Sequence, residues 1–299
     1  MPILSIQKVS KQYHNHLAVD DVSFDMPEGS ILGLLGPNGA GKTSLIRIIT
    51  SITRADSGVV LFNGEPLNMS HPEQIGYLPE ERGLYRKMKV GEQLIYLAQL
   101  KGMTKSEARI EIEKWLVKFE MSAWWNKKIE ELSKGMQQKV QFVSTIVHRP
   151  SLIILDEPFT GLDPINTKLI KHEIKQLNES GTSIIFSTHR MEQVEEICEY
   201  IVLINKGQNI LQGEVNHIKE TYKDHLFRIT YEGHYEAGTI DANGIIAHEG
   251  NTITIKKDAL ANANQFLRHL MDRGILVQKF EEVLPTLNDI FIKKVTEST

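Results

Sequence analysis

A glycine-rich segment near the N-terminus carries the clearest chemical pattern of the chain. It reads Gly36-Pro37-Asn38-Gly39-Ala40-Gly41-Lys42-Thr43 and fits the phosphate-loop pattern GxxxxGK[ST]. Glycines let the backbone curl so that successive N–H groups point at phosphate oxygens. Lys42 can reach the outer phosphates, and the hydroxyl of Thr43 can bind Mg²⁺. A helix that begins near Thr43 and Ser44 adds its positive end. The segment therefore predicts a site for ATP and Mg²⁺.

Two adjacent carboxylates follow a second apolar run. Residues 152–155 are all aliphatic, and Asp156 and Glu157 come directly after them. Asp156, at the end of a buried strand, can hold Mg²⁺ through its water shell. Glu157 is suited to orient or deprotonate an attacking water. Such pairs also occur as solvated strand ends, but the phosphate loop upstream favours the catalytic interpretation.

A histidine follows a third apolar run. Residues 183–186 are predicted to form a buried strand, and His189 comes shortly after it. In a parallel sheet the carboxyl ends of the strands meet at one edge, where ligands gather. A histidine in this position is most often structural. The neighbouring phosphate loop and acid pair instead favour contact with a γ-phosphate.

The elements that must position these residues indicate an α/β core. Residues 31–35, 152–155, 183–186 and 201–204 read as buried parallel strands. Shorter antiparallel strands are expected over residues 1–30 and 58–64, where Asn63-Gly64 predicts a turn. Residues 88–144 have a helical pattern that includes a capping box, Thr104 with Glu107, and a stripe containing Ile110 and Val117. Asp163, Pro164 and Gly181 bracket a further helix.

The pattern of apolar and polar residues changes after about residue 220. Short alternating strands, such as residues 251–255, and two amphipathic helices, one over 287–295, predict a small α+β domain. We therefore expect a domain over residues 1–220, with a helical subdomain at about 88–144, and a C-terminal accessory domain over 221–299.

Composition excludes several other classes of protein. The chain has 34 basic and 38 acidic residues and a formal net charge of −4, so no nucleic-acid partner is expected. A single cysteine, Cys198, cannot form an internal disulfide and fits a reducing, cytosolic compartment. No apolar run approaches the ~18 residues of a membrane span. A soluble protein is expected, and any membrane crossing would belong to another polypeptide.

Four motifs in this order resemble the ATP-binding cassette (ABC) ATPase family over about residues 3–220. Besides the phosphate loop, residues 132–139 (Leu-Ser-Lys-Gly-Met-Gln-Gln-Lys) resemble the LSGGQ signature and residues 160–163 the D-loop. His189 resembles the switch histidine, and Tyr13 the aromatic residue that stacks on adenine. The resemblance implies a P-loop NTPase (RecA-like) core with an antiparallel β subdomain and a helical signature subdomain.

The resemblance also implies partners. Ser133 and Gly135 of the signature would contact the γ-phosphate of ATP bound to a second ATP-binding subunit, so a head-to-tail dimer, of two copies or with a close paralogue, is expected. The chain departs from the family at Lys134 and Met136, and at Glu80, which stands where the Q-loop glutamine is usual and keeps an oxygen for Mg²⁺ or water. Residues 81–88 would contact a membrane-spanning permease.

The C-terminal segment that contains residues 284–291 resembles the extension of bacterial ABC exporter ATPases of the sodium-efflux-like and ABC-2 types. This favours export and a position on the cytoplasmic face of the plasma membrane.

Two other functions compete with the transporter ATPase. A soluble ABC clamp acting on ribosomes or nucleic acid usually carries two cassettes or long coiled coils, and this chain has one phosphate loop and no sustained heptads. The signature segment argues against a P-loop kinase of another family.

Overall fold

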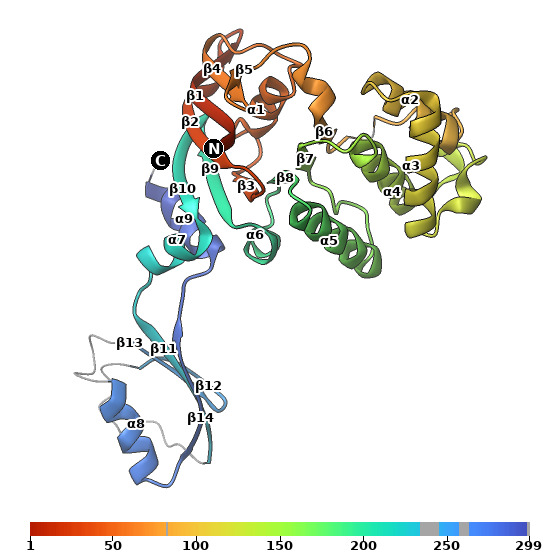
Figure 1. Cartoon of the computed structure of the whole chain (residues 1–299). Helices are drawn as coiled ribbons and strands as arrows, with labels where there is room; N and C mark the ends of the chain where they lie inside the picture. Colours follow the sequence, from red (N-terminus) through yellow and green to blue (C-terminus); the bar gives the residue numbers. More distant parts are fainter. Residues whose placement is uncertain (82, 234–244, 257–262, 298–299) are drawn as a thin grey trace. The chain divides into compact units, whose positions relative to one another are not determined.

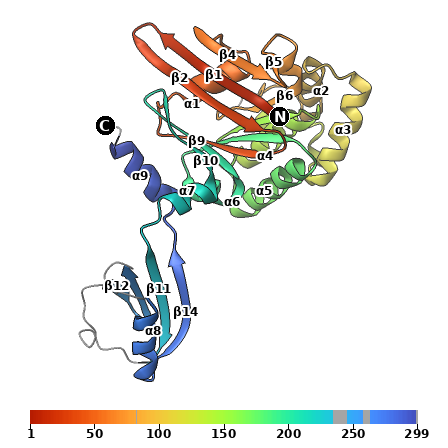
Figure 2. The same ribbon diagram turned by 60° about the vertical axis from the view of Figure 1, so that its left-hand side comes forward.

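The computed structural model describes residues 1–81, 83–233, 245–256 and 263–297 (Figures 1 and 2). These residues form two compact units, Met1–Val215 and Asn216–Glu297. The division that we predicted between residues 220 and 221 lies at the end of helix α7 (Val215–Thr221). Of the predicted C-terminal domain, residues 234–244, 257–262 and 298–299 lie outside the described residues.

A six-stranded sheet forms the centre of the first unit. Its order is β10 (Gln208–Glu214), β9 (Tyr200–Asn205), β3 (Ile31–Leu35), β8 (Ser183–Ser187), β7 (Leu152–Asp156) and β6 (Ile75–Leu78). All neighbours are parallel except β10, which runs antiparallel to β9. Every residue of β3, β7 and β8 is buried, as expected for parallel strands covered on both faces. The four predicted parallel strands are confirmed, whereas β6 and β10 were not predicted.

A four-stranded antiparallel sheet, with the order β2-β1-β4-β5, is the second sheet of this unit (Figure 2). Its strands are β1 (Pro2–Tyr13), β2 (His16–Pro27), β4 (Ser57–Phe62) and β5 (Glu65–Pro66). Strands β1 and β2 are longer than predicted because they form one continuous hairpin, in which Tyr13 pairs with His16 at the tip. Asn63 and Gly64 both have positive φ, 51° and 79°, as a tight hairpin turn requires.

Helices complete the first unit. They are α1 (Lys42–Ile49), α2 (Val90–Leu100), α3 (Lys105–Lys118), α4 (Lys134–Ile146), α5 (Pro164–Glu179) and α6 (Met191–Ile197), with short 3₁₀ turns at His71–Gln74, Ser122–Trp124 and Ile129–Glu131. The predicted caps are confirmed: Thr104 and Glu107 form a capping box on α3, and Asp163 accepts from the backbone N–H of Asn166 at the start of α5. The stripe on α3 with Ile110 and Val117 is exposed, and the buried face of that helix is Ala108, Ile112 and Leu116.

The second unit has its own α+β core. Its sheet has the order β12 (Ile245–Glu249), β13 (Thr252–Lys256), β11 (Leu226–Glu232) and β14 (Leu276–Val283), and all neighbours are antiparallel. Phe266 and Leu270 of helix α8 (Ala263–Asp272) pack on buried side chains of β11 and β13. The predicted terminal helix is α9 (Leu287–Glu297). Among the described residues, no helix is long and apolar enough to span a membrane.

Candidate nucleotide site

The phosphate loop joins β3 to α1 and has a backbone that only glycine accommodates at two positions. Gly36 has φ +149°, and a β-carbon there would lie 2.2 Å from the carbonyl oxygen of Ile204. Gly41 has φ +111°, and a β-carbon there would lie 2.2 Å from the carbonyl oxygen of Ala18. The loop is therefore pressed against strands β9 and β2. This close approach explains why the glycines stand at these positions of the pattern.

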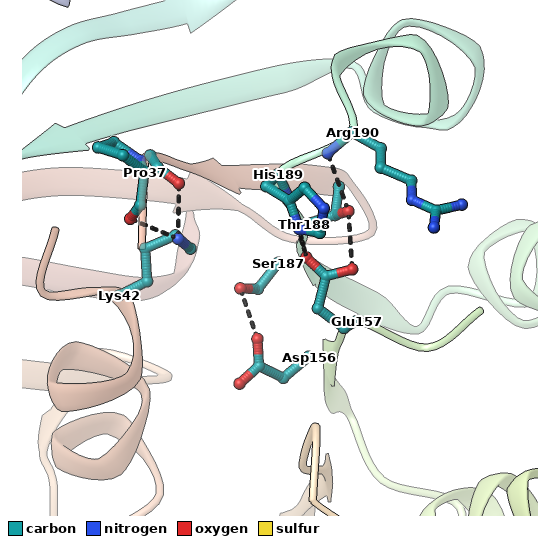
Figure 3. Close-up of polar contacts among 9 residues, drawn as sticks. Pro37, Lys42, Asp156, Glu157, Ser187, Thr188, His189 and Arg190 are labelled. Carbon is teal, nitrogen blue, oxygen red and sulfur yellow. Dashed lines mark hydrogen bonds and ion pairs between the residues drawn. The ribbon is translucent and has the colours of Figure 1, made fainter. Parts of the chain in front are cut away.

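Lys42 folds back over the loop that precedes it. Its ammonium donates to the carbonyl oxygens of Gly36, at 2.6 Å, and Pro37, at 3.1 Å (Figure 3). Burial lowers the pKa of Lys42, while the charges of Asp156, Glu157 and Glu80 oppose that shift. Both of these acceptors are neutral carbonyls, so the positive charge of Lys42 remains available to an anionic phosphate.

Asp156 ends strand β7 in a buried position. Its side chain is only 5% exposed, and Oδ1 accepts a hydrogen bond from Ser187 Oγ at 2.8 Å (Figure 3). Ser187 is the residue that pairs with Asp156 across β7 and β8. Burial raises the pKa of Asp156, helped by the charges of Glu80 and Glu157 and opposed by the Ser187 bond and Lys42. The carboxylate is therefore poised to gain from a nearby cation.

Glu157 is held by the residues that follow β8. Its Oε1 accepts from the backbone N–H and from Nδ1 of His189, at 2.9 and 2.6 Å, and its Oε2 accepts from Thr188 Oγ1 at 3.2 Å (Figure 3). Its own N–H donates to the carbonyl of Ser187 at 2.9 Å. Glu157 has φ +49°, a conformation that is unfavourable for a side chain of this size and is concentrated at functional sites.

These residues line one cleft of about 410 Å³. Of the predicted site residues, the cleft lining includes Tyr13, Asn38, Gly39, Ala40, Gly41, Lys42, Thr43, Ser44, Glu80, Asp156, Glu157 and His189. Gly36 and Pro37 are connected to it through their hydrogen bonds with Lys42. The lining also contains His16 and Ala18, which sequence reasoning missed. His16 lies beside Tyr13 because the two residues pair at the hairpin tip, a contact that the sequence alone does not reveal.

The donors in the cleft fit Mg²⁺. Thr43 offers a hydroxyl, and Asp156 and Glu80 offer carboxylate oxygens, the hard ligands that Mg²⁺ takes in small number together with phosphate oxygens. No cluster of three or more His, Cys, Asp or Glu side chains that could hold a metal occurs in the part of the chain that the structure describes. Because Mg²⁺ is usually held by one or two carboxylates together with phosphate oxygens, the donors of the cleft suit a metal that arrives with a phosphate ligand.

The signature segment lies outside this cleft. Ser133 is exposed and is the N-cap of α4, accepting from the N–H of Met136 at 3.3 Å. Gly135, in the first turn of α4, lies near the backbone of Gly161: a β-carbon at Gly135 would be 3.6 Å from the carbonyl oxygen of that residue. Neither Ser133 nor Gly135 lines the cleft that contains Lys42.

Two glutamines of α4 connect the signature helix to the cleft, and sequence reasoning missed both. Gln138 Nε2 donates to the carbonyl of Pro158 at 3.0 Å, and Gln141 Nε2 donates to the carbonyl of Pro79 at 3.1 Å. Pro158 follows Glu157, and Pro79 precedes Glu80. Both glutamines are buried. Their three-residue spacing on one face of a helix is the signal that could have drawn attention to them.

The fold and the cleft together define a nucleotide-binding protein of the P-loop class. Comparison with known proteins gives the family. The family model for ABC transporters matches residues 19–160, and the family model for the C-terminal domain of DrrA1-3-like ATP-binding proteins matches residues 213–295. The chain belongs to the ATP-binding proteins of ABC transporters.

Individual relatives agree with this family. An uncharacterised ABC transporter ATP-binding protein, YhaQ of Bacillus subtilis (strain 168), is 44% identical over 98% of both chains. The Nod factor export ATP-binding protein I of Burkholderia pseudomallei (strain 1710b) is 34% identical over 70% of each chain. A solved ATP-binding subunit of an ABC transporter is 28% identical, with a TM-score of 0.69 over 74% of this chain and 93% of the other. The expected family and fold class are confirmed.

Proposed function

We propose that the chain hydrolyses ATP in this cleft, in the presence of Mg²⁺, and acts as the motor of a membrane transporter. The observation that carries the proposal is Glu157, which shares one cleft with the phosphate loop and is oriented there by Thr188 and His189. A carboxylate in this position can accept a proton from water beside a terminal phosphate.

The chain's own residues account for the steps of hydrolysis. The oxygen of water bonds to the γ-phosphorus, the bond between that phosphorus and the β–γ bridging oxygen breaks, and ADP leaves. Glu157 takes the proton of the attacking water, and Lys42 offsets the charge on the transferred phosphoryl group. His189, bonded to Glu157 through Nδ1, positions that carboxylate and lines the same cleft. Mg²⁺, held by Thr43, Asp156 and Glu80, would neutralise phosphate charge when it is bound.

We further propose that two ATP-binding subunits associate head to tail. The exposed N-terminus of α4, with Ser133 and Gly135, lies outside the cleft of its own chain. A helix N-terminus offers free N–H groups and positive potential to an anion. This end of α4 therefore suits the γ-phosphate of ATP bound to another subunit, either a second copy or a close paralogue. ATP held between two subunits would favour the closed dimer.

Mixed variants test this arrangement. Each composite site has one half from the phosphate loop of one chain and one half from the signature segment of the other. Lys42→Ala removes the lysine that binds phosphate in the first half, and Ser133→Arg obstructs the second half, so each variant alone should lose ATPase activity. In a head-to-tail dimer of the two variants, one composite site combines the intact Lys42 of one chain with the intact Ser133 of the other. An equal mixture should recover about a quarter of the wild-type rate, because half of the dimers are mixed and each has one intact site.

A matched mixture supplies the control. Lys42→Ala mixed with Thr43→Ala places both changes in the same half-site, so no intact composite site forms and no activity should return. Equal recovery in both mixtures, or none in either, would contradict the head-to-tail site. Nucleotide binding by the Ser133→Arg chain, measured with a fluorescent ATP analogue, separates loss of the composite site from loss of folding.

The transporter role includes a separate membrane-spanning permease, to which this chain would bind on the cytoplasmic face of the plasma membrane. An exposed aromatic pair supports it: Tyr85 and Tyr96 are 53% and 41% exposed, and their rings meet edge to face at 6.1 Å. Tyr85 lies in the predicted contact segment 81–88, of which residue 82 is outside the described residues. Exposed aromatics of this kind favour protein contacts.

Export is the direction that we propose, because one relative is named for export and residues 284–291 resemble the extension of bacterial ABC exporter ATPases. Purification of the tagged chain from detergent-solubilised membranes should recover a multi-span membrane protein. Tyr85→Ala should reduce that recovery while ATP binding is retained. Tyr200 is half-buried and packs against the core, so Tyr200→Phe is the control and should leave the recovery unchanged. Recovery of ribosomes or nucleic acid without a membrane protein would contradict the transporter role.

A further inference from the structure

Strand β14 (Leu276–Val283) is an edge strand of the second unit. Within the described residues its sheet neighbour is β11 alone, so its other edge presents free N–H and C=O groups. Figure 2 shows β14 along one side of that sheet. It is eight residues long, and long edges with apolar side chains readily pair with another strand. Leu276 and Phe280 of this strand are 61% and 38% exposed.

The sequence of this edge is complementary to itself in the antiparallel direction. Residues 276–284 read Leu-Val-Gln-Lys-Phe-Glu-Glu-Val-Leu. Reversal about Phe280 matches leucine with leucine, valine with valine, glutamine with glutamate and lysine with glutamate. We propose that β14 pairs antiparallel with β14 of a second copy of this chain, about a two-fold axis at Phe280. The interface is separate from the ATP-dependent contact of the first unit.

The charges fit this pairing. Lys279 and Glu281 lie on the same face of β14, where they form an ion pair of 2.7 Å within the strand, with 62% and 35% of their side chains exposed. Around an axis at Phe280, Lys279 would stand opposite Glu281 of the partner subunit, and Glu281 opposite Lys279 of the partner subunit. Opposite charges in directly opposed positions stabilise a strand pair, and like charges destabilise it. A lone lysine on an edge usually prevents pairing; here each lysine has a complementary acid.

The aromatic centre fits as well. The ring of Phe280 stacks on that of Phe227 at 5.2 Å with an interplanar angle of 7°, yet it remains 38% exposed. The two-fold axis brings Phe280 next to Phe280 of the partner subunit and removes this surface from water. The register shift between β11 and β14 falls at residues 277–279. Residues 279–281, which flank the proposed axis, lie in the regular part of the ladder with β11, and the shift lies toward the two ends of the proposed pairing.

The opposite edge of the sheet lacks these properties. Strand β12 (Ile245–Glu249) has only five residues, against eight in β14. Reversal of its sequence matches Glu249 with Ile245 and offers no ion pair. Only β14, of the two edges that the structure describes, has a sequence that favours a second copy of itself.

Charge reversal in the full chain, without nucleotide, tests the proposal. Analytical ultracentrifugation of wild type should show a dimer that does not depend on ATP and that persists in Lys42→Ala. Lys279→Glu and Glu281→Lys each place like charges in both opposed positions, so each should weaken the dimer by roughly tenfold or more. A mixture of the two variants should restore dimers. Neither variant contains the ion pair within the strand, so restoration reports contact between chains.

A cysteine at the axis gives an independent readout. Opposed antiparallel residues have Cα atoms ~4.5–5.5 Å apart, which a disulfide can bridge. Phe280→Cys should therefore form a crosslinked dimer on oxidation. Phe227 stacks on Phe280 but lies on β11, an internal strand of the sheet, so Phe227→Cys should not form a crosslinked dimer. Cys198 is buried, and burial raises the pKa of its thiol, so Cys198 should not form a crosslink under these conditions. A monomeric wild type, a mixture that fails to restore dimers, or equal crosslinking at both positions would each overturn the proposal.

Discussion

Replacement of Glu157 by glutamine separates chemistry from binding at the candidate site. The amide keeps the shape of the side chain and an oxygen that can accept from the backbone N–H of His189, a bond of 2.9 Å in the structure. It loses the negative charge and the ability to accept a proton from water. We expect ATP binding to be retained, because the substitution leaves the phosphate loop and Lys42 unchanged and removes one negative charge from beside the phosphates.

The expected size of the effect follows from the two roles of the carboxylate. A general base contributes about 10²–10⁴ in rate, or about 3–5 kcal/mol in the activation barrier. The hydrogen bond with His189 contributes little to folding, because the histidine side chain is 58% exposed and a typical hydrogen bond contributes a net ~1 kcal/mol. Turnover should therefore fall by two orders of magnitude or more, with little change in the free energy of unfolding.

The assay compares Glu157→Gln with Glu192→Gln, an exposed glutamate on α6 outside the cleft. Phosphate release reports turnover, and a fluorescent ATP analogue reports affinity. Size-exclusion chromatography with and without ATP reports the ATP-dependent dimer, in chains that also carry Lys279→Glu so that pairing through β14 is weakened. Glu157→Gln should accumulate as a nucleotide-bound dimer, and Glu192→Gln should behave as wild type. Turnover within about threefold of wild type in Glu157→Gln would remove this residue from the mechanism, because a general base contributes far more.

Three further outcomes are expected. Gly41→Ala should weaken ATP binding far more than Gly39→Ala, because a β-carbon at Gly41 meets a backbone oxygen at 2.2 Å while that at Gly39 meets open space; equal affinities in a binding titration would contradict the loop geometry. Gln138→Met should lower the free energy of unfolding in urea by about 1–3 kcal/mol, because the carbonyl of Pro158 loses its buried donor, and no change would show that another donor replaces it. Burial, assisted by the charge of Lys101, lowers the pKa of His148 to about 4. Below the ordinary histidine pKa near 6.5 the unfolded chain therefore binds a proton that the native state does not, and the free energy of unfolding should fall by about 2 kcal/mol from pH 8 to pH 5. His148→Gln should reduce that loss in the same denaturation series.

The buried strands and the phosphate loop could be predicted because their signals are local. An unbroken aliphatic run such as residues 152–155 predicts a buried strand wherever the chain places it, and the glycine pattern of residues 36–43 specifies its own backbone. The acids at 156 and 157 follow from the strand, since parallel strands end at one edge of the sheet. The structure agrees with these predictions, and the Asn63-Gly64 turn and the caps of α3 and α5 agree for the same reason.

What could not be predicted depends on contacts between distant segments. Strand β6 is only four residues long and is defined by its pairing with β7, which its own sequence does not reveal. The hydrogen bonds of Gln138 and Gln141 depend on the position of α4 against two loops. On α3, apolar residues occur on more than one face, and packing against α2 and neighbouring elements decides that Ile112 is buried and Ile110 exposed. The positive φ of Glu157 has no local sequence signal.

The two glutamine bonds of α4 have a mechanical consequence. Their acceptors are the carbonyls of Pro79 and Pro158, residues whose rings fix φ and remove one backbone freedom. Each of these carbonyls also belongs to the planar peptide group that leads into an acid, Glu80 or Glu157, so a rotation of α4 would pull on the backbone of both. Pressure that a neighbouring molecule applies to the exposed end of this helix would therefore act on the backbone at Glu80 and at Glu157 together.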